Sequence, residues 1–121
     1  MNKKTCINVI GAPLDLGVSK LGVDMGPTAL RYAGIFEALA ITGFACRDSG
    51  DISVRSNFSL DMLPQEERRE EKRKEITRAA EQLAQFTYDC CQQGEFPLTL
   101  GGDHSTTIGA LSGVSKAHER I

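Results

Sequence analysis

The chain has 121 residues, a formal net charge of −2, 40% hydrophobic residues and 25% charged residues. This length suits a single domain and is sufficient to bury a core. The near-neutral charge gives no basis for a nucleic-acid or anionic-membrane partner, and no apolar stretch approaches the ~20 residues that cross a bilayer.

The first half of the chain predicts two strands and two short helices. Thr5–Ile10 is β-branched and apolar, and the sequence GAP ends it, which predicts a short buried strand followed by a loop. After a glycine-rich, irregular loop, Pro27 fits the first turn of a helix. A second helix over Ile35–Ile41 should stop at Gly43. The sequence FACRDSGDI is typical of a second strand with a polar exit.

A long helix is the strongest signal in the second half. Residues Ser53–Pro64 are expected to form a loop, and Gln65–Gln93 then carries apolar side chains at helical spacing up to Gly94. The charged run Glu66–Glu75 mixes both signs, which favours a solvated face over a docking surface. Within this run Glu70 and Lys74 stand four residues apart, in the order that favours an ion pair.

The remaining residues predict a third strand and a third helix. The sequence FPLTL at 96–100 is apolar throughout, so we expect a strand that is buried on both faces. Residues 105–121 should form a helix that is capped by Ser105 or Thr106. The order β-α-β-α-β-α predicts an α/β fold in which helices cover a parallel sheet of about three strands.

The four cysteines stand at positions 6, 46, 90 and 91 and form no CxxC pair. This spacing excludes zinc-ribbon and thioredoxin-type sites. The start, MNKKTCINVIGAP, lacks the longer apolar region and the cleavage site of a secretory signal. We therefore expect four free thiols in a cytoplasmic protein.

One of the two histidines stands where the third strand ends and the last helix begins. His104 follows Gly101 and Gly102, which allow a tight turn. It lies beyond the carboxyl end of the strand, where open parallel sheets bind ligands. His104 is therefore a candidate metal ligand, and a hydrogen-bonded loop formed with Asp103 is the alternative, because a metal site needs three or more ligands.

Other residues add little to this candidate site. The sequence GAP at 11–13 should open at the same rim, and Asp15, Asp24 and Asp51 also stand in loops after strands. The second histidine, His118, has polar neighbours and is expected on the surface. The sequence GGDHST lacks the lysine and the spacing of a phosphate-binding loop, and three consecutive residues rarely converge as a catalytic triad.

Three stretches together resemble the ureohydrolase family, and bacterial arginases most of all. They are GAPLDLGVSKLGVDMGPTALRYAG, the SGD at Ser49–Asp51 and FPLTLGGDHSTTIGALSG, and the resemblance runs from Cys6 to about His118. It implies a three-layer α/β/α fold with a parallel sheet. It also implies a two-manganese site that hydrolyses L-arginine to L-ornithine and urea. By the motif match, His104 corresponds to a ligand of one manganese ion.

The resemblance also implies that much of the family site is absent from this sequence. The other manganese ligands stand in a DAHxD motif and a later DxDxxDP motif, and neither is present. We expect residues 1–121 to form a single partial domain that contains the metal ligand His104 and no catalytic residue. The substrate would be a small guanidinium compound, and intact family members are usually homo-oligomers.

Three interpretations of the whole protein stay open at this point. The chain is the N-terminal segment of an arginase, a remnant that is not an enzyme, or a segment of another ureohydrolase such as agmatinase or formimidoylglutamase. In each case we expect the chain alone to be inactive on arginine, since one neutral imidazole does not hold two metal ions.

Overall fold

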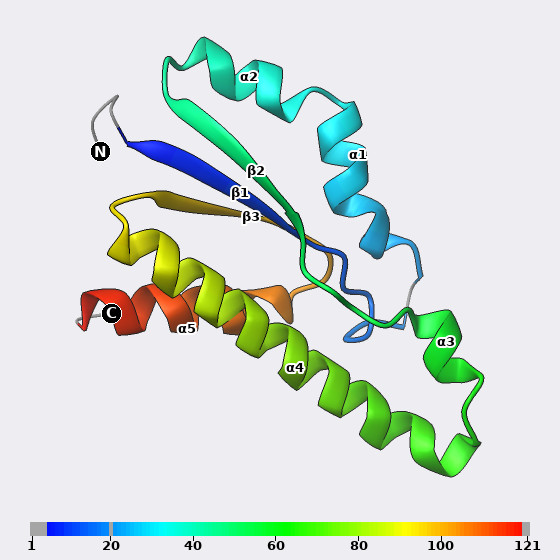
Figure 1. Cartoon of the computed structure of the whole chain (residues 1–121). Coiled ribbons are helices and arrows are strands. Elements are labelled where there is room, and N and C mark those ends of the chain that lie inside the picture. The colour runs from blue at the N-terminus through cyan, green and yellow to red at the C-terminus, as the bar shows by residue number, and fades with distance from the viewer. Residues whose placement is uncertain (1–4, 20, 120–121) are drawn as a thin grey trace.

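The computed structural model describes residues 5–19 and 21–119, in which strands and helices alternate along the chain (Figure 1). This alternation confirms the predicted order. The elements are β1 (Cys6–Ala12), the 3-10 helix η1 (Val23–Met25), α1 (Gly26–Tyr32), α2 (Ile35–Ile41), β2 (Ala45–Asp51), α3 (Asn57–Asp61), α4 (Gln65–Gln92), β3 (Phe96–Gly101) and α5 (Thr106–His118).

The three strands form one parallel sheet in the order β2-β1-β3. Ile7 of β1 lies between Cys46 of β2 and Phe96 of β3, so the first strand of the chain is the central one. Helices α1 and α2 lie on one face of the sheet, and α4 and α5 lie on the other (Figure 1). The fold is thus α/β, with the three layers expected for the N-terminal part of an α/β/α arrangement.

The core has two parts because alternate residues of a strand point to opposite faces. On the α4 face, Ile10 belongs to the same buried cluster as Ala79 and Leu83 of α4. On the opposite face, Ile7 and Val9 pack with partly buried apolar side chains of α2. The two clusters pack against opposite faces of β1, so this strand is held on both sides.

Glycines end the helices where the sequence predicted. Gly43 and Gly94 follow α2 and α4 with φ angles of 81° and 73°, in the left-handed region that glycine adopts at low cost. Pro27 stands in the first turn of α1, also as predicted. The last predicted helix extends through 121, and its final two residues lie outside the described residues.

Three local predictions were wrong. The segment 53–64 contains helix α3, whose start is capped by Ser56 Oγ accepting from the amide of Ser59 at 3.1 Å. In place of the predicted ion pair of Glu70 with Lys74, the ion pairs have a spacing of three residues. Glu70 pairs with Arg73, and Glu71 pairs with Lys74.

The prediction that the third strand is buried on both faces was also wrong. Phe96 is 47% exposed, and of the apolar residues in β3 only Leu100 is buried. The reason is its position at the edge of the sheet, where β1 is its only strand partner among the described residues.

No helix in the described part of the chain is both long and apolar enough to span a membrane. The four cysteines are unpaired, as predicted. Burial raises the pKa of the Cys90 thiol to about 11, so this thiol is inert and serves as a core side chain.

Candidate functional site

His104 lies just past the carboxyl end of β3, in the loop that leads into α5. Its side chain is exposed, and within residues 5–19 and 21–119 its imidazole forms no hydrogen bond. The same residues contain no group of three or more histidine, cysteine or acidic side chains placed to hold a metal. The imidazole therefore fits one ligand position, and a complete metal site needs further donors.

Asp103, the neighbour of His104, is engaged inside the protein. It is buried, and its Oδ2 accepts a hydrogen bond from the amide of Gly17 at 2.8 Å. Its Oδ1 accepts from the amide of Ser105 at 2.8 Å and also from the Ser105 hydroxyl. The alternative interpretation of an internally bonded loop is thus correct for Asp103, although it leaves His104 available.

Two glycines allow the loop of His104 to lie directly against other backbone segments. Gly102 has a φ of 73°, and a Cβ added there would lie 2.4 Å from the carbonyl oxygen of Ala12. A Cβ added to Gly26, the first residue of α1, would lie 2.2 Å from the carbonyl oxygen of Gly101. The motif stretches GAPLDLG, GVDMGP and GGDHS, which are far apart in the sequence, therefore meet at this one point.

Asp15 and Asp24 lie at the same end of the sheet but do not join His104 in a ligand set. They line a hollow of about 260 Å³ together with residues of α3. Burial raises the pKa of the Asp15 carboxyl, and the negative charges of Asp24 and Asp103 raise it further. Burial and these two negative charges therefore disfavour the charged form of the Asp15 carboxyl.

Asp51 was expected in a loop after a strand, but it is the last residue of β2 and its carboxylate is paired with Arg31. Its Oδ1 accepts from Nη1 of Arg31 at 2.6 Å. The same guanidinium donates to both oxygens of Asp48, at 3.0 and 2.9 Å, which holds the pKa of that carboxyl below its usual range. Arg31 thus ties α1 to the end of β2, a positional role that the sequence alone did not reveal.

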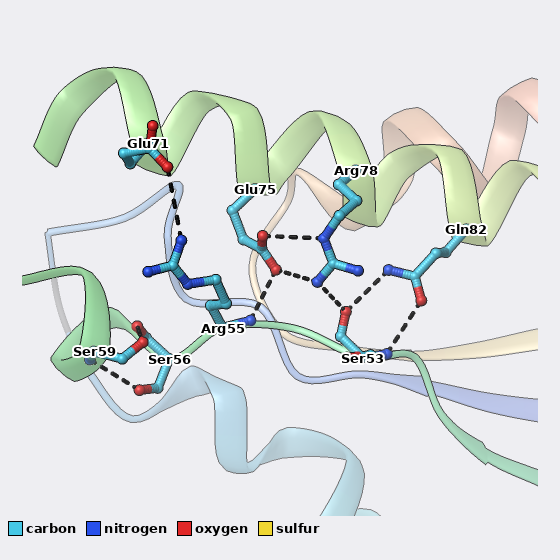
Figure 2. A network of polar contacts seen from close by, with 8 residues as sticks. All are labelled: Ser53, Arg55, Ser56, Ser59, Glu71, Glu75, Arg78 and Gln82. Carbon is cyan, nitrogen blue, oxygen red and sulfur yellow. Dashed lines mark hydrogen bonds and ion pairs between the residues drawn. The ribbon is translucent and has the colours of Figure 1, made fainter. Parts of the chain in front are cut away.

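A second polar network fixes the loop that follows β2 (Figure 2). Glu75 of α4 is buried, and its Oε1 accepts from the amide of Arg55 at 2.8 Å and from Nη2 of Arg78 at 2.5 Å. Arg78 also donates to the carbonyl of Ser53 at 2.8 Å. Sequence reasoning missed Glu75 because it ends a charged run that is otherwise largely exposed.

His118 is exposed, as predicted, and lies far from His104 along α5. It lines a hollow of about 450 Å³ with Cys91, Phe96, Pro97 and Val114. This hollow is at the amino end of β3, whereas His104 follows the carboxyl end. The two histidines therefore belong to opposite ends of the sheet and do not share a site.

Comparison with known proteins gives a consistent result. A model of the arginase family matches residues 6–121. The arginase of Bacillus caldovelox is 44% identical over 115 residues, which make up 95% of this chain and 38% of that protein. The arginase of Brevibacillus brevis is 43% identical over 119 residues, or 96% of this chain and 37% of that protein.

A solved structure shows the same agreement in three dimensions. The crystal structure of arginase from Bacillus subtilis matches with a TM-score of 0.75 at 38% identity, covering 93% of this chain and 35% of that chain. The chain thus spans less than two fifths of the length of these relatives. Because the family model matches nearly every residue and the fold agrees, this chain belongs to the arginase family.

Proposed function

We propose that this chain is the N-terminal part of a manganese-dependent ureohydrolase that hydrolyses L-arginine to L-ornithine and urea. One observation carries the proposal: in a chain of the arginase family, an exposed imidazole stands at the carboxyl end of β3. Ligands of parallel α/β sheets bind at this end. The bacterial arginases that resemble the chain over nearly its whole length support the choice of arginine.

His104 would hold one of two manganese ions through an imidazole nitrogen. When bound, a manganese pair supplies a Lewis acid and a water molecule that is nucleophilic near neutral pH. The described residues contribute the ligand and the loops that hold it, and they contribute no catalytic acid or base. The carboxylate ligands and the groups that grip the substrate would come from chain outside these 121 residues.

The same proposal covers the organisation of the protein. Residues 1–121 would form one partial domain of a homo-oligomeric enzyme whose partner is a small guanidinium substrate. Four unpaired cysteines agree with a reducing compartment, and we therefore assign the protein to the cytoplasm.

The 121-residue chain by itself should release no urea from L-arginine in the presence of Mn²⁺. A two-metal site needs carboxylates to hold the ions about 3.5–4 Å apart, and His104 offers a single neutral donor. Urea production should be measured against a reaction that contains manganese alone. Urea release that disappears in His104→Ala would contradict this expectation.

Manganese should also bind only weakly to this chain. Mn²⁺ prefers several oxygen ligands, whereas Asp103 and Asp51 are occupied by internal hydrogen bonds and by Arg31. Titration calorimetry should show no stoichiometric binding in the micromolar range. A well-defined one-site isotherm that is lost in His104→Ala would show that the chain holds a metal unaided.

A chimera tests whether His104 supports manganese-dependent hydrolysis of arginine when the rest of the site is present. Residues 6–119 would replace the matching segment of the Bacillus caldovelox arginase, whose own residues would provide the rest of the site. We expect manganese-dependent hydrolysis of arginine, and a loss of kcat/KM for His104→Ala that exceeds the roughly 10–100-fold typical when only the hydrogen-bond partner of a metal ligand is removed. The matched control is His118→Ala, which changes the other histidine and should leave the rate unchanged.

The coding sequence downstream of Ile121 separates the remaining interpretations. An open frame that encodes the DAHxD motif would support a ureohydrolase, and the substrate-gripping residues that follow would distinguish arginase from agmatinase and formimidoylglutamase. A stop codon with no such frame in the natural gene would instead favour a protein that is not an enzyme.

A further inference from the structure

We propose that Asp103 is a positioning residue that fixes the direction in which His104 leaves the loop between β3 and α5. The inference rests on the proposed function, because it concerns the side chain that would bind manganese. It assigns Asp103 a role through its neighbour and no contact with the metal or the substrate.

The carboxylate of Asp103 connects two separate stretches of backbone. On one side, Oδ2 accepts from the amide of Gly17, which belongs to the loop after β1 and lies 86 positions away in the sequence. On the other side, Oδ1 accepts from the amide of Ser105 and from its hydroxyl. The side chain thus joins the exit of β1 to the start of α5.

The backbone of Asp103 is held as firmly as its side chain. Its amide donates to the carbonyl of Leu14 at 2.8 Å. Its carbonyl accepts a hydrogen bond at 2.9 Å from Oγ1 of Thr106, which is the first residue of α5. Because the amide, the carbonyl and both carboxylate oxygens all have partners, the backbone angles of this residue have little freedom, and they set where the next residue points.

His104 depends on this arrangement because its own side chain does not anchor it. The imidazole is exposed and forms no hydrogen bond within the part of the chain that the structure describes. A metal ligand must be held close to its binding geometry before the metal arrives, or affinity is lost in ordering it. In this loop the ordering comes from the residue that precedes the ligand.

The chemistry of the three donors explains why an aspartate suits the position. Gly17 and Ser105 each present a backbone N–H, and the Ser105 hydroxyl adds a third donor. A carboxylate is an acceptor at both oxygens, so it satisfies all three. An asparagine would place its NH₂ group against one of the two backbone N–H groups, and that contact would be lost.

Close packing prevents the loop from relaxing around a lost contact. Gly102 lies against the carbonyls of Ala12 and Leu14, and Gly101 lies against Gly26 at the start of α1. A loop that is packed this closely cannot restore its geometry by small shifts. A substitution at Asp103 should therefore change the orientation of His104.

The test uses the chimera described above, prepared free of metal, with Asp103→Asn as the main variant. We expect the dissociation constant for Mn²⁺ to rise about tenfold, as is typical when the support of a metal ligand is removed. We also expect faster hydrogen exchange at the amides of Gly17 and Ser105, measured by mass spectrometry or NMR without metal.

Glu75→Gln is the matched control because it changes another buried carboxylate that accepts from a loop amide, in the network of Figure 2. It should lower the midpoint of thermal unfolding as Asp103→Asn does, and leave the manganese affinity unchanged. A general loss of stability would move both variants alike, so the difference between their manganese affinities isolates positioning.

Gly17→Ala gives an independent variant if Asp103→Asn does not fold. Its Cβ would lie 3.1 Å from Oδ2 of Asp103 and push the carboxylate by a few tenths of an ångström, with residues 101–105 unchanged. Manganese affinity should fall in this variant too, by a smaller factor. Unchanged manganese affinity in Gly17→Ala, when hydrogen exchange at the amides of residue 17 and Ser105 is faster, would overturn the inference.

The remaining outcomes distinguish the two proposals. If His104→Ala weakens manganese binding while Asp103→Asn exchanges faster and binds as before, only the positioning role of Asp103 is refuted. If His104→Ala itself binds manganese normally, the assignment of the ligand fails, and the inference about Asp103 fails with it.

Discussion

Glu75 has a buried carboxylate whose neighbours stabilise its charged form. The hydrogen bond from Arg78 lowers the pKa of this carboxyl below its usual range, and the bond from the amide of Arg55 lowers it further, against the opposing effect of burial. The charge therefore persists at neutral pH and holds the loop after β2 against α4.

Replacing Glu75 by Gln should destabilise the chain by about 1.5–3 kcal/mol at neutral pH, the usual range for hydrogen bonds to a charged group. Because the folded-state pKa is lowered, the stabilisation is complete above the unfolded pKa of 4.5 and is lost as the pH falls through the folded-state pKa. Urea unfolding at neutral and at strongly acidic pH should show a difference between the two proteins that shrinks in acid.

The control for this measurement is Glu81→Gln, which changes an exposed carboxylate on the same helix. It should alter the free energy of unfolding little at either pH. A loss for Glu75→Gln that is equally large at both pH values would assign the effect to side-chain packing and not to charge.

Helices α4 and α5 approach each other so closely that glycine is required between them. A Cβ added to Gly109 would lie 2.3 Å from the carbonyl oxygen of Ala80, and one added to Gly113 would lie 2.0 Å from Oγ1 of Thr87. That hydroxyl also donates to the carbonyl of Ala110 at 3.0 Å, across the interface. At Gly109 the backbone of α5 lies against the backbone of α4, and at Gly113 it lies against the Thr87 side chain as well, which fixes α5 along one face.

Gly113→Ala should destabilise the chain by about 1–3 kcal/mol, the usual range for overpacking. Helix propensity alone predicts the opposite change in stability, because alanine is a better helix former than glycine by about 1 kcal/mol. A destabilised variant would therefore indicate overpacking. Ser112→Ala, at an exposed neighbouring position of α5, should be neutral or stabilising. Thermal unfolding that shows Gly113→Ala more stable than wild type would mean that the helices are farther apart.

The whole molecule has two sheet edges of different character. The β2 edge carries charged and polar side chains, including Arg47 and Asp48, which discourage pairing with another strand. The β3 edge carries Phe96, at 47% exposed, and nearby α5 exposes Ile108 and Leu111 at 60% and 57%. An open apolar edge of this kind is a template for association.

The isolated 121-residue chain should therefore associate or pack loosely. Size-exclusion chromatography with light scattering, over a range of protein concentrations, should show species larger than a monomer or a broad monomer peak. The outcome that would contradict this is a sharp, concentration-independent monomer peak together with a cooperative thermal transition, which would identify the chain as a self-sufficient domain.

The sequence by itself determined the features that depend on neighbouring residues. The order of strands and helices, the helix ends at Gly43 and Gly94, and the place of His104 after β3 all follow from local periodicity and from the backbone freedom of glycine. The motif stretches also sufficed to recognise the family. Helix α3 was missed because a five-residue helix has too little periodicity to register, although its cap Ser56 was visible.

The tertiary structure decided which distant residues meet. Asp103 and Gly17 are separated by 86 positions. No local sequence pattern indicates that the Asp103 carboxylate accepts a hydrogen bond from the Gly17 amide. Glu75 belongs to a charged run, and only the path of the loop after β2 buries it. Such contacts depend on how the elements pack, because burial and partner choice are properties of the folded surface and not of the adjacent sequence.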